Sequence, residues 1–225
     1  MKKDSSQKPI NFLTNDLYFP SVENANAEGL LAVGGDLSPE RLMLAYKSGI
    51  FPWFNEGSLI LWWSPDPRMV LFPERIKISK SMRKILKNNQ FSLTKNSCFE
   101  AVVDQCALAK RVGQEGTWIT NEMKEAYLKL HEMGFAKSYE VWQDDKMVGG
   151  LYGIDLGHIF CGESMFSLVS NASKFAFIKL AEELHQKKYS LIDCQLYTKH
   201  LESLGAEEIP RSRFIEILKK TRLIH

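Results

Sequence analysis

The sequence predicts an α+β protein with a small N-terminal domain, residues 1–70, and a larger mixed-sheet domain, residues 71–225. Residues 137–161 contain three apolar or alternating runs separated by two short polar turns, the pattern of three strands joined by hairpins. An apolar helix is expected over residues 171–186, followed by one more apolar run at 191–196. A strand, a helix and a strand in one sheet give parallel neighbours, so the sheet should be mixed.

Composition excludes several classes of protein. Of the 225 residues, 44% are apolar and 25% charged, and the net charge of +2 excludes a bulk polycation but not a local basic face. No apolar run reaches the length of a transmembrane helix, and the N-terminal lysines precede no signal-like segment, so a cytoplasmic location is expected. The cysteines form no CxxC pair and the histidines show no metal-ligand spacing, which predicts free thiols and no metal site.

The N-terminal part begins with a predictable helix and continues with an aromatic segment. Ser38 is the expected N-cap, Pro39 occupies the first turn and Gly49 ends the helix. Residues 50–68 then contain three of the five tryptophans and several prolines. Two interpretations stay open: a small aromatic core, or a cleft in which Trp53 offers a flat apolar wall to a base or an apolar side chain.

The next segment is expected to begin with a strand edge at 75–79 and to continue as a basic helix. Four basic residues recur at helical spacing on one face of that helix, opposite an apolar face: Lys80, Arg83, Lys84 and Lys87. An ordinary solvated helix has the same pattern. If the substrate is a nucleic acid, the stripe suits contacts with its phosphates.

Two further helices are expected over residues 99–109 and from the Thr120 cap to Gly134. Trp118, just before the second helix, is either a core anchor or another wall of a cleft. The sequence does not decide between these two roles.

Polar residues gather where two neighbouring strands end. The strand at 159–161 is expected to stop at Gly162-Glu163-Ser164, and the strand at 191–195 carries Asp193 and Gln195. Because parallel strands end at the same edge of a sheet, these three polar side chains should approach one another. Asp193 in an apolar strand requires a partner, and Gln195, two residues on, should share its face.

Each of these polar residues also has a structural explanation. Asp193 can be bonded to backbone, and Glu163 can be a partner for a basic residue such as Lys174. Ser173 and Lys174 open the crossover helix, where they either cap it or meet the phosphates of an RNA 3′ end.

Long motifs along nearly the whole chain resemble the bacterial leucyl/phenylalanyl-tRNA–protein transferases. They include GLLAVGGDLSPERLMLAYKSGIFPWF, LWWSPDPR, EGTWIT, VGGLYG, FCGESMFS, LIDCQ and SLGAEEIPR, in this order. The resemblance implies a GNAT-like (acyl-CoA N-acyltransferase-like) fold, whose core order matches the strands and helix expected above. The sequence departs from the family at its ending, residues 222–225, because some members continue with a further tail.

The resemblance implies an enzyme that moves Leu or Phe, with Met as a further candidate, from aminoacyl-tRNA to proteins with N-terminal Arg or Lys, marking them for N-end-rule degradation. The ester is already activated, so no cofactor, metal or acyl-enzyme is required. The partners are then aminoacyl-tRNA and the acceptor protein, without a membrane, and a monomer is expected. The basic stripe and Lys174 would bind the tRNA.

The resemblance assigns Asp193 and Gln195 to catalysis and Glu163 to the substrate site. We expect Asp193 to orient Gln195 and to stabilise the attacking amine, while Gln195 holds the amine or the carbonyl in line. Ser173 is included in the substrate site. The expected apolar walls of the aminoacyl pocket, which should disfavour side chains branched at Cβ, are Trp53, Trp118, Leu151, Phe160, Met165 and Leu180.

Three other functions compete with this one. An acetyl-CoA-dependent GNAT N-acetyltransferase usually carries a glycine-rich loop before the crossover helix, and residues 164–171 lack it. A peptidoglycan-type aminoacyl-tRNA transferase would lack the matched N-terminal domain. A catalytically silent RNA-binding protein would need no polar pair on a buried strand.

Overall fold

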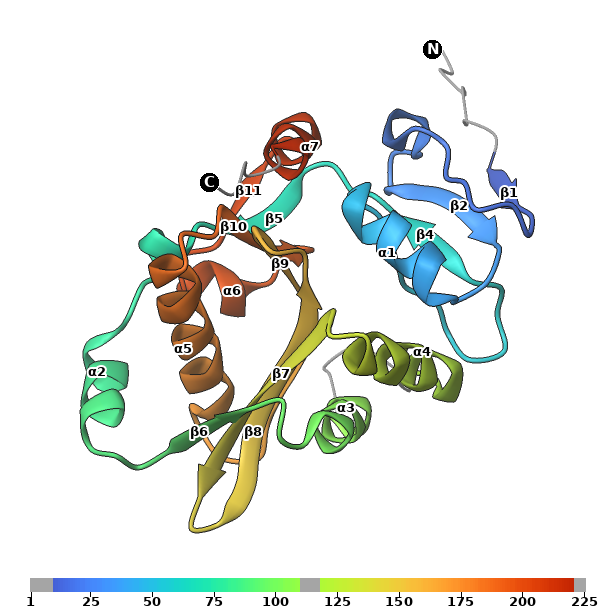
Figure 1. Cartoon of the computed structure of the whole chain (residues 1–225). Coiled ribbons are helices and arrows are strands. Elements are labelled where there is room, and N and C mark those ends of the chain that lie inside the picture. The colour runs from blue at the N-terminus through green and yellow to red at the C-terminus, as the bar shows by residue number, and fades with distance from the viewer. Residues whose placement is uncertain (1–9, 110–117, 221–225) are drawn as a thin grey trace, which may run out of the picture.

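The computed structural model of the protein describes residues 10–109 and 118–220, which form two sheets with helices around them (Figure 1). The ending at 222–225, where the sequence departs from the family pattern, lies outside the described residues. The N-terminal sheet has the order β1-β2-β4-β3. Its strands are β1 (Asn11–Leu13), β2 (Leu30–Gly34), β3 (Phe51–Pro52) and β4 (Leu61–Trp63), and a 3-10 turn covers Val22–Asn24.

The predicted N-terminal helix is confirmed as α1 (Pro39–Lys47). The Ser38 hydroxyl accepts a hydrogen bond from the Arg41 N–H at 3.3 Å, as an N-cap should. The aromatic segment satisfies both of its interpretations, because Trp62 is fully buried in the core whereas Trp53 is 39% exposed.

The second sheet has seven strands in the order β11-β5-β10-β9-β8-β7-β6. The three predicted antiparallel strands are β7, β8 and β9, and β10 pairs parallel with β9 after the crossover helix α5, so the mixed sheet is confirmed. The strands are β5 (Arg68–Leu71), β6 (Ser92–Lys95), β7 (Ala136–Gln143), β8 (Lys146–Asp155), β9 (Ile159–Ser167), β10 (Leu191–Gln195) and β11 (Glu207–Ile209). Strand β5 crosses the expected boundary after residue 70, which stays a prediction.

Two sequence expectations about strands are wrong. Residues 75–79 form no strand, since a 3-10 turn covers Pro73–Arg75 and the Lys77 N–H donates to the Leu204 carbonyl in a loop (2.8 Å). Strand β9 also does not stop near Gly162. It continues to Ser167 because β8 is long enough to pair with it as far as Gly149.

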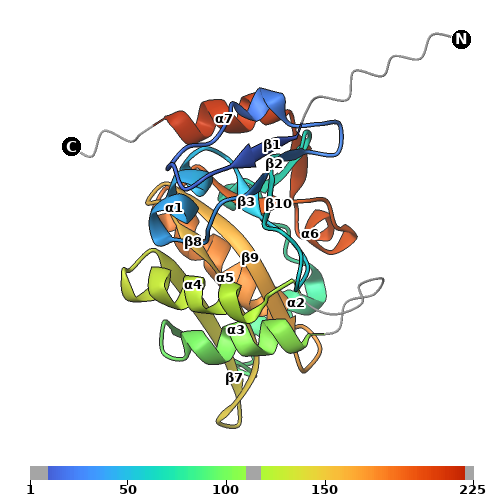
Figure 2. The same ribbon diagram turned by 90° about the vertical axis from the view of Figure 1, so that its right-hand side faces the viewer.

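Helices cover both faces of the large sheet. On one face lie α3 (Phe99–Leu108) and α4 (Asn121–Glu132), side by side in Figure 2, and on the other lie α5 (Ala172–Gln186) and α2 (Lys80–Lys87). Two short helices complete the fold, α6 (Lys199–Ser203) and α7 (Arg211–Lys219).

The N-terminal part is packed tightly against α7. Gly49 has φ +77°, and a Cβ at this position would lie 2.5 Å from Ile215 Cδ1. Glycine is therefore required both by the backbone and by the close approach of α7. This contact joins the N-terminal part of the chain to the C-terminal helix α7.

Candidate active site

A cavity of about 470 Å³ opens between the C-terminal end of β10 and the middle of β9, beside the N-terminal part of the chain. Its lining is mostly apolar and comes from β3, β8, β9, α5, α6 and the segment after β10. The lining residues are Phe51, Pro52, Trp53, Trp118, Leu151, Tyr152, Gly162, Glu163, Ser164, Met165, Phe177, Leu180, Cys194, Gln195, Leu196, Thr198, His200 and Leu201.

A β-bulge places Glu163 in this cavity. Tyr152 of β8 pairs with Ser164, and Gly153 pairs with Gly162, so Glu163 is the extra residue of β9. Bulges interrupt the alternation of side chains and re-aim a residue, and they are common beside active sites. Gly153 makes this arrangement possible, since a Cβ there would lie 2.2 Å from the Cys161 carbonyl oxygen.

A second irregularity, on β10, places Gln195. The pairing with β5 shifts register between Asp193 and Gln195, and Gln195 has φ +63°, in the left-handed region. The expectation that Asp193 and Gln195 share a face rested on simple strand alternation, which this shift interrupts. Gln195 reaches the cavity, and its Nε2 donates to Glu163 Oε1 at 2.9 Å. The predicted approach of Glu163 and Gln195 is therefore observed.

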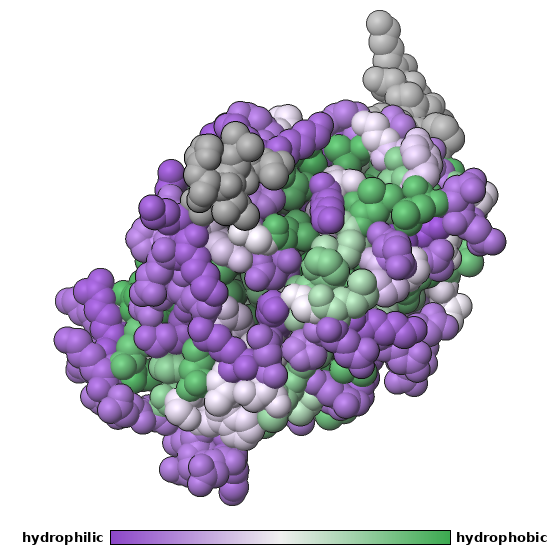
Figure 3. Space-filling view, viewed as in Figure 1, coloured by the Kyte–Doolittle hydropathy of each residue, from purple (hydrophilic) through white to green (hydrophobic). Residues whose placement is uncertain are grey.

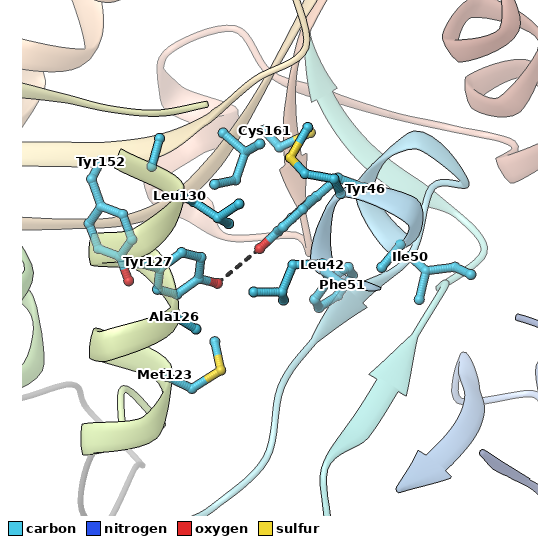
Figure 4. Close-up of a cluster of buried hydrophobic side chains, with 14 of the residues drawn as sticks. Leu42, Tyr46, Ile50, Phe51, Met123, Ala126, Tyr127, Leu130, Tyr152 and Cys161 are labelled. Atoms are coloured by element: carbon cyan, nitrogen blue, oxygen red, sulfur yellow. Dashed lines mark hydrogen bonds between the residues drawn. The ribbon is translucent and has the colours of Figure 1, made fainter. Parts of the chain in front are cut away.

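Two tyrosines hold Glu163 from the opposite side. Tyr127 of α4 donates to Glu163 Oε2 at 2.6 Å, and the Tyr46 hydroxyl of α1 lies 2.9 Å from that of Tyr127. Figure 4 shows the Tyr46 and Tyr127 rings pointing toward each other from the two helices. A hydrogen-bonded chain therefore runs from the N-terminal part through Glu163 to Gln195. Neither tyrosine was expected at the site, because each stands among the apolar residues of its helix in the sequence and only its hydroxyl distinguishes it.

The Glu163 carboxyl has an unusual proton affinity. Burial raises its pKa to about 7, although the hydrogen bond from Tyr127 opposes that rise, and the nearby negative charge of Asp193 adds to it. Burial also raises the pKa of Tyr46 and of Tyr127 well above the ordinary value, so both stay protonated and can donate. Glu163 therefore changes charge near neutral pH while the donors around it do not.

Asp193 lies beneath the cavity and does not line it. Its side chain is 1% exposed and forms a two-pronged ion pair with Arg68, at 2.8 Å to Nε and 2.7 Å to Nη2. The Arg68 guanidinium also lies over the rings of Phe51 and Phe214, at 4.8 and 4.7 Å from their centroids. Asp193 Oδ1 accepts the Gln195 N–H at 3.0 Å. Asp193 therefore supports the Gln195 backbone from beneath the cavity, and its expected stabilisation of the attacking amine stays a prediction.

Five of the six predicted apolar walls line the cavity: Trp53, Trp118, Leu151, Met165 and Leu180. The prediction was wrong for Phe160, which is 1% exposed and packs in the core, with its ring centroid 6.4 Å from that of Tyr139. Phe160 precedes the bulge, so it keeps the ordinary alternation and faces the interior. The sequence analysis missed Phe51, Phe177 and His200 as lining residues. The first two belong to apolar runs without any distinguishing mark.

A second cavity, of about 490 Å³, adjoins the first through Met165 and His200. Ser173 lines this second cavity and not the first, so of the predicted substrate-site residues it shares a cavity only with Met165. Burial and the charge of Lys174 lower the pKa of His200. Within residues 10–109 and 118–220, His200 Nε2 is buried without a hydrogen-bond partner.

The predicted basic stripe lies on α2, outside both of these cavities. Ser79 caps the helix and Met82 is buried, as the amphipathic pattern indicated, while all four basic residues, Lys80, Arg83, Lys84 and Lys87, are exposed. None of the four forms an ion pair within the described chain. Figure 3 shows the hydrophilic surface over α2, in contrast to the apolar side chains that gather over α1 and the N-terminal sheet.

Two further properties concern the described residues alone. No helix among them is long and apolar enough to cross a bilayer. No group of three or more His, Cys, Asp or Glu residues among them could hold a metal ion. The four cysteines are free thiols.

Comparison with known proteins identifies the family. Residues 70–219 match the model of the leucyl/phenylalanyl-tRNA protein transferases, and residues 35–66 match that of their N-terminal domain. A leucyl/phenylalanyl-tRNA–protein transferase of Flavobacterium johnsoniae is 65% identical over 92% of this chain and 98% of the relative. One of Flavobacterium psychrophilum is 57% identical over 94% of this chain and the whole relative. The chain therefore belongs to the leucyl/phenylalanyl-tRNA protein transferase family and is an aminoacyltransferase.

Proposed function

We propose that this protein transfers Leu or Phe from aminoacyl-tRNA to the α-amino group of proteins that begin with Arg or Lys, which marks them for N-end-rule degradation. The observation that carries the proposal is an apolar cavity with the hydrogen-bonded pair Glu163–Gln195 at its wall. The names of the relatives support Leu, Phe and tRNA as substrates. The family resemblance supports the Arg or Lys acceptor and a monomer acting in the cytoplasm.

The chemistry of the transfer matches the groups in the cavity. An aminoacyl ester needs a neutral amine, held in line with its carbonyl, and stabilisation of the charges that develop. A carboxylate can only accept hydrogen bonds, so Nε2 of Gln195 must face Glu163. No hydrogen bond from the described residues occupies Oε1 of Gln195, which leaves that oxygen to accept a bond from the attacking amine.

In this proposal Asp193 is a positioning residue. It holds the Gln195 N–H and is itself held by Arg68, so the left-handed turn that aims Gln195 at the amine is fixed from below. Gln195 and Glu163 are the residues that touch the substrate.

The apolar walls account for the choice of amino acid. Trp53, Trp118, Leu151, Met165 and Leu180 surround a space for an apolar side chain. Leu and Phe carry a CH₂ at Cβ, whereas Ile and Val are branched there and stiff at χ1, so they fit a narrow entrance less well. Discrimination between apolar side chains of this kind amounts to roughly 10–200-fold in kcat/KM.

The exposed stripe on α2, with Lys174, is proposed to contact the phosphates of the tRNA. Each such contact contributes affinity through counterion release, so binding should weaken with salt. Log affinity falls linearly with log salt concentration. When Lys84 and Lys87 are removed together, the slope of that line should become less negative by about 1–2. Lys129 on α4 offers a control lysine outside the stripe.

A single reaction tests the proposed function. The purified protein is mixed with leucyl-tRNA and an Arg-initiated peptide, without CoA or ATP, and leucyl-peptide should form. Acetyl-CoA in place of leucyl-tRNA should give no acetyl-peptide. Acetylation instead of leucylation would make the protein an N-acetyltransferase, and comparable transfer from isoleucyl-tRNA would refute the pocket model.

A further inference from the structure

We propose that Glu163 is the proton carrier of the transfer: its carboxylate takes a proton from the attacking amine and returns it to the ribose oxygen that leaves. This inference rests on the proposed function and goes beyond the binding role expected for Glu163. It makes Glu163, and not Asp193, the acid–base group of the site.

The position of the carboxylates excludes the alternative. Among the described residues that line the main cavity, Glu163 is the only carboxylate. Asp193 is 1% exposed, and its two oxygens are bound by Arg68 and by the Gln195 N–H. A general base must lie within hydrogen-bond reach of the proton that it abstracts, and of these two carboxylates only Glu163 lies at the cavity wall.

The hydrogen bonds of Glu163 place it beside the expected position of the amine. Its Oε1 accepts from Gln195 Nε2, and its Oε2 accepts from Tyr127. An amine that donates to Oε1 of the same Gln195 amide lies at the cavity wall that Gln195 and Glu163 share. The carboxylate is thus fixed on both oxygens while it faces the reacting nitrogen.

The proton affinity of Glu163 suits transfer in both directions. Its pKa is about 7, close to the ~7.7–8.0 of an α-amino group, whereas an ordinary glutamate near 4.3 would be a poor acceptor. A base is most effective when its pKa lies near the working pH. The same match lets the protonated form give the proton back.

The titratable neighbours of Glu163 do not change protonation state in this pH range. Tyr46 from α1, Tyr127 from α4 and Cys161 from β9 have pKa values raised well above ordinary by burial, so they stay neutral. Asp193 from β10 is paired with Arg68 from β5. His200 also lines the cavity, and burial with the Lys174 charge lowers its pKa.

The proposed step is an ester aminolysis in which atoms and charges balance. The neutral amine attacks the ester carbonyl, and a nitrogen–carbon bond forms while the nitrogen becomes positive. Glu163 removes one proton from that nitrogen. The bond from carbon to the ribose oxygen then breaks, and Glu163 returns the proton to this oxygen, which yields the amide, free tRNA and the original carboxylate.

The test compares Glu163→Gln with wild type on two acceptors: an Arg-initiated peptide, and the same peptide with an aminooxy group in place of its terminal amine. With the ordinary peptide, kcat should fall on the order of 10²–10³-fold, the usual contribution of a general base. The aminooxy nitrogen in the addition intermediate is far more acidic and loses its proton to water. The fold decrease in kcat of Glu163→Gln relative to wild type should therefore be at least tenfold smaller with that acceptor.

The control variant is Asp155→Asn, which removes a carboxylate that also accepts a tyrosine hydroxyl, from Tyr189 at 2.8 Å, but lies outside the main cavity. It should transfer at the wild-type rate. Equal deficits of Glu163→Gln with both acceptors would reduce Glu163 to a positioning residue and overturn the inference, as would an unchanged rate. Absence of transfer by the wild type would instead remove the proposed function.

If Glu163→Gln does not fold, Tyr127→Phe tests the same inference with the carboxylate in place. The hydrogen bond from Tyr127 lowers the pKa of Glu163, so its loss should move the rise of kcat with pH to higher pH. The acceptor is the Arg-initiated peptide, and because wild type and variant share the titration of its amine, the shift between their two profiles reports Glu163. An unchanged or lowered inflection would overturn the inference.

Discussion

Two carboxylates on neighbouring strands, Asp193 and Glu163, have opposite electrostatic surroundings in this protein. Both bind Gln195, since Glu163 accepts from its side-chain amide and Asp193 from its backbone N–H. Asp193 faces the cation of Arg68, whereas Glu163 faces neutral donors only. A buried carboxylate with a cation keeps its charge balanced, but neutral hydrogen bonds offset only part of the cost of burial. This difference is the reason for the roles proposed above, support for Asp193 and proton transfer for Glu163.

The largest expected effect follows from breaking the buried ion pair. Asp193→Asn leaves the Arg68 charge buried without a counterion, and the free energy of unfolding should fall by about 3–5 kcal/mol. Urea unfolding at pH 7.5 measures this loss. Near-normal transfer by a folded Asp193→Ala protein, which offers no side-chain acceptor to the Gln195 N–H, would refute the role of Asp193 in orienting Gln195.

An exposed ion pair provides the matched control for this variant. The side chains of Arg75 and Glu207 are 59% and 46% exposed and 2.7 Å apart. Glu207→Gln should cost less than about 1 kcal/mol, because water and salt screen exposed charges. If both variants lose the same small free energy of unfolding, burial does not distinguish the two ion pairs. The contrast drawn between Asp193 and Glu163 is then wrong for Asp193.

The next largest effect concerns Glu163 and depends on pH. Its pKa is about 7 in the folded protein and about 4.3 in an unfolded chain, so the folded state binds the proton more tightly. Stability due to this group is therefore present at low pH and is lost as pH rises through 7. Relative to Glu163→Gln, wild type should lose on the order of 3 kcal/mol between pH 4 and pH 8.

Urea unfolding of the two proteins at several pH values measures this difference directly, since all other titrating groups are common to both. A difference that stays constant from pH 4 to pH 8 would mean that Glu163 has an ordinary pKa. It would then resemble a solvated glutamate, and the contrast with Asp193 would vanish.

The sequence predicted the part of the fold that is encoded locally. Alternation and helical periodicity located β7, β8, β10 and α5, because each is long enough to carry its own period. The short strands β5, β6 and β11 were missed, since three or four residues show no period and pair only when a partner is present. The same reasoning explains the error at residues 75–79.

The candidate site was predictable as a place but not as a geometry. The parallel pairing of β9 and β10 brings Glu163 and Gln195 together as expected, although β9 continues past Glu163. The bulge at Glu163 carries no sequence signal apart from nearby glycines. Arg68, the partner of Asp193, is 125 residues away in the sequence, and Tyr46 and Tyr127 are 81 residues apart. Such pairings depend on tertiary packing, which no local pattern encodes.

A smaller effect is expected when Glu163 loses one of its neutral donors. Tyr127→Phe removes a 2.6 Å hydrogen bond to a group that is charged above pH 7. Hydrogen bonds to charged groups contribute about 1.5–3 kcal/mol and neutral ones about 1 kcal/mol. The loss of unfolding free energy should therefore be larger at pH 8 than at pH 5. An equal loss at both values would show that Glu163 does not change charge between them.

The smallest effect belongs to Tyr46, which bonds the Tyr127 hydroxyl and lowers the pKa of Glu163 less than Tyr127 does. Tyr46→Phe removes the bond to Tyr127 and a weaker one to Glu163, so it should cost about 1 kcal/mol at pH 5 and only slightly more at pH 8. Transfer should change less than about threefold, because Tyr127 still donates to Glu163. Urea unfolding and the leucyl-tRNA reaction measure both. A pH-dependent cost as large as that of Tyr127→Phe would show that the two hydroxyls act as one unit. The neutral support of Glu163 would then extend into the N-terminal part, just as the ionic support of Asp193 extends through Arg68 to Phe51.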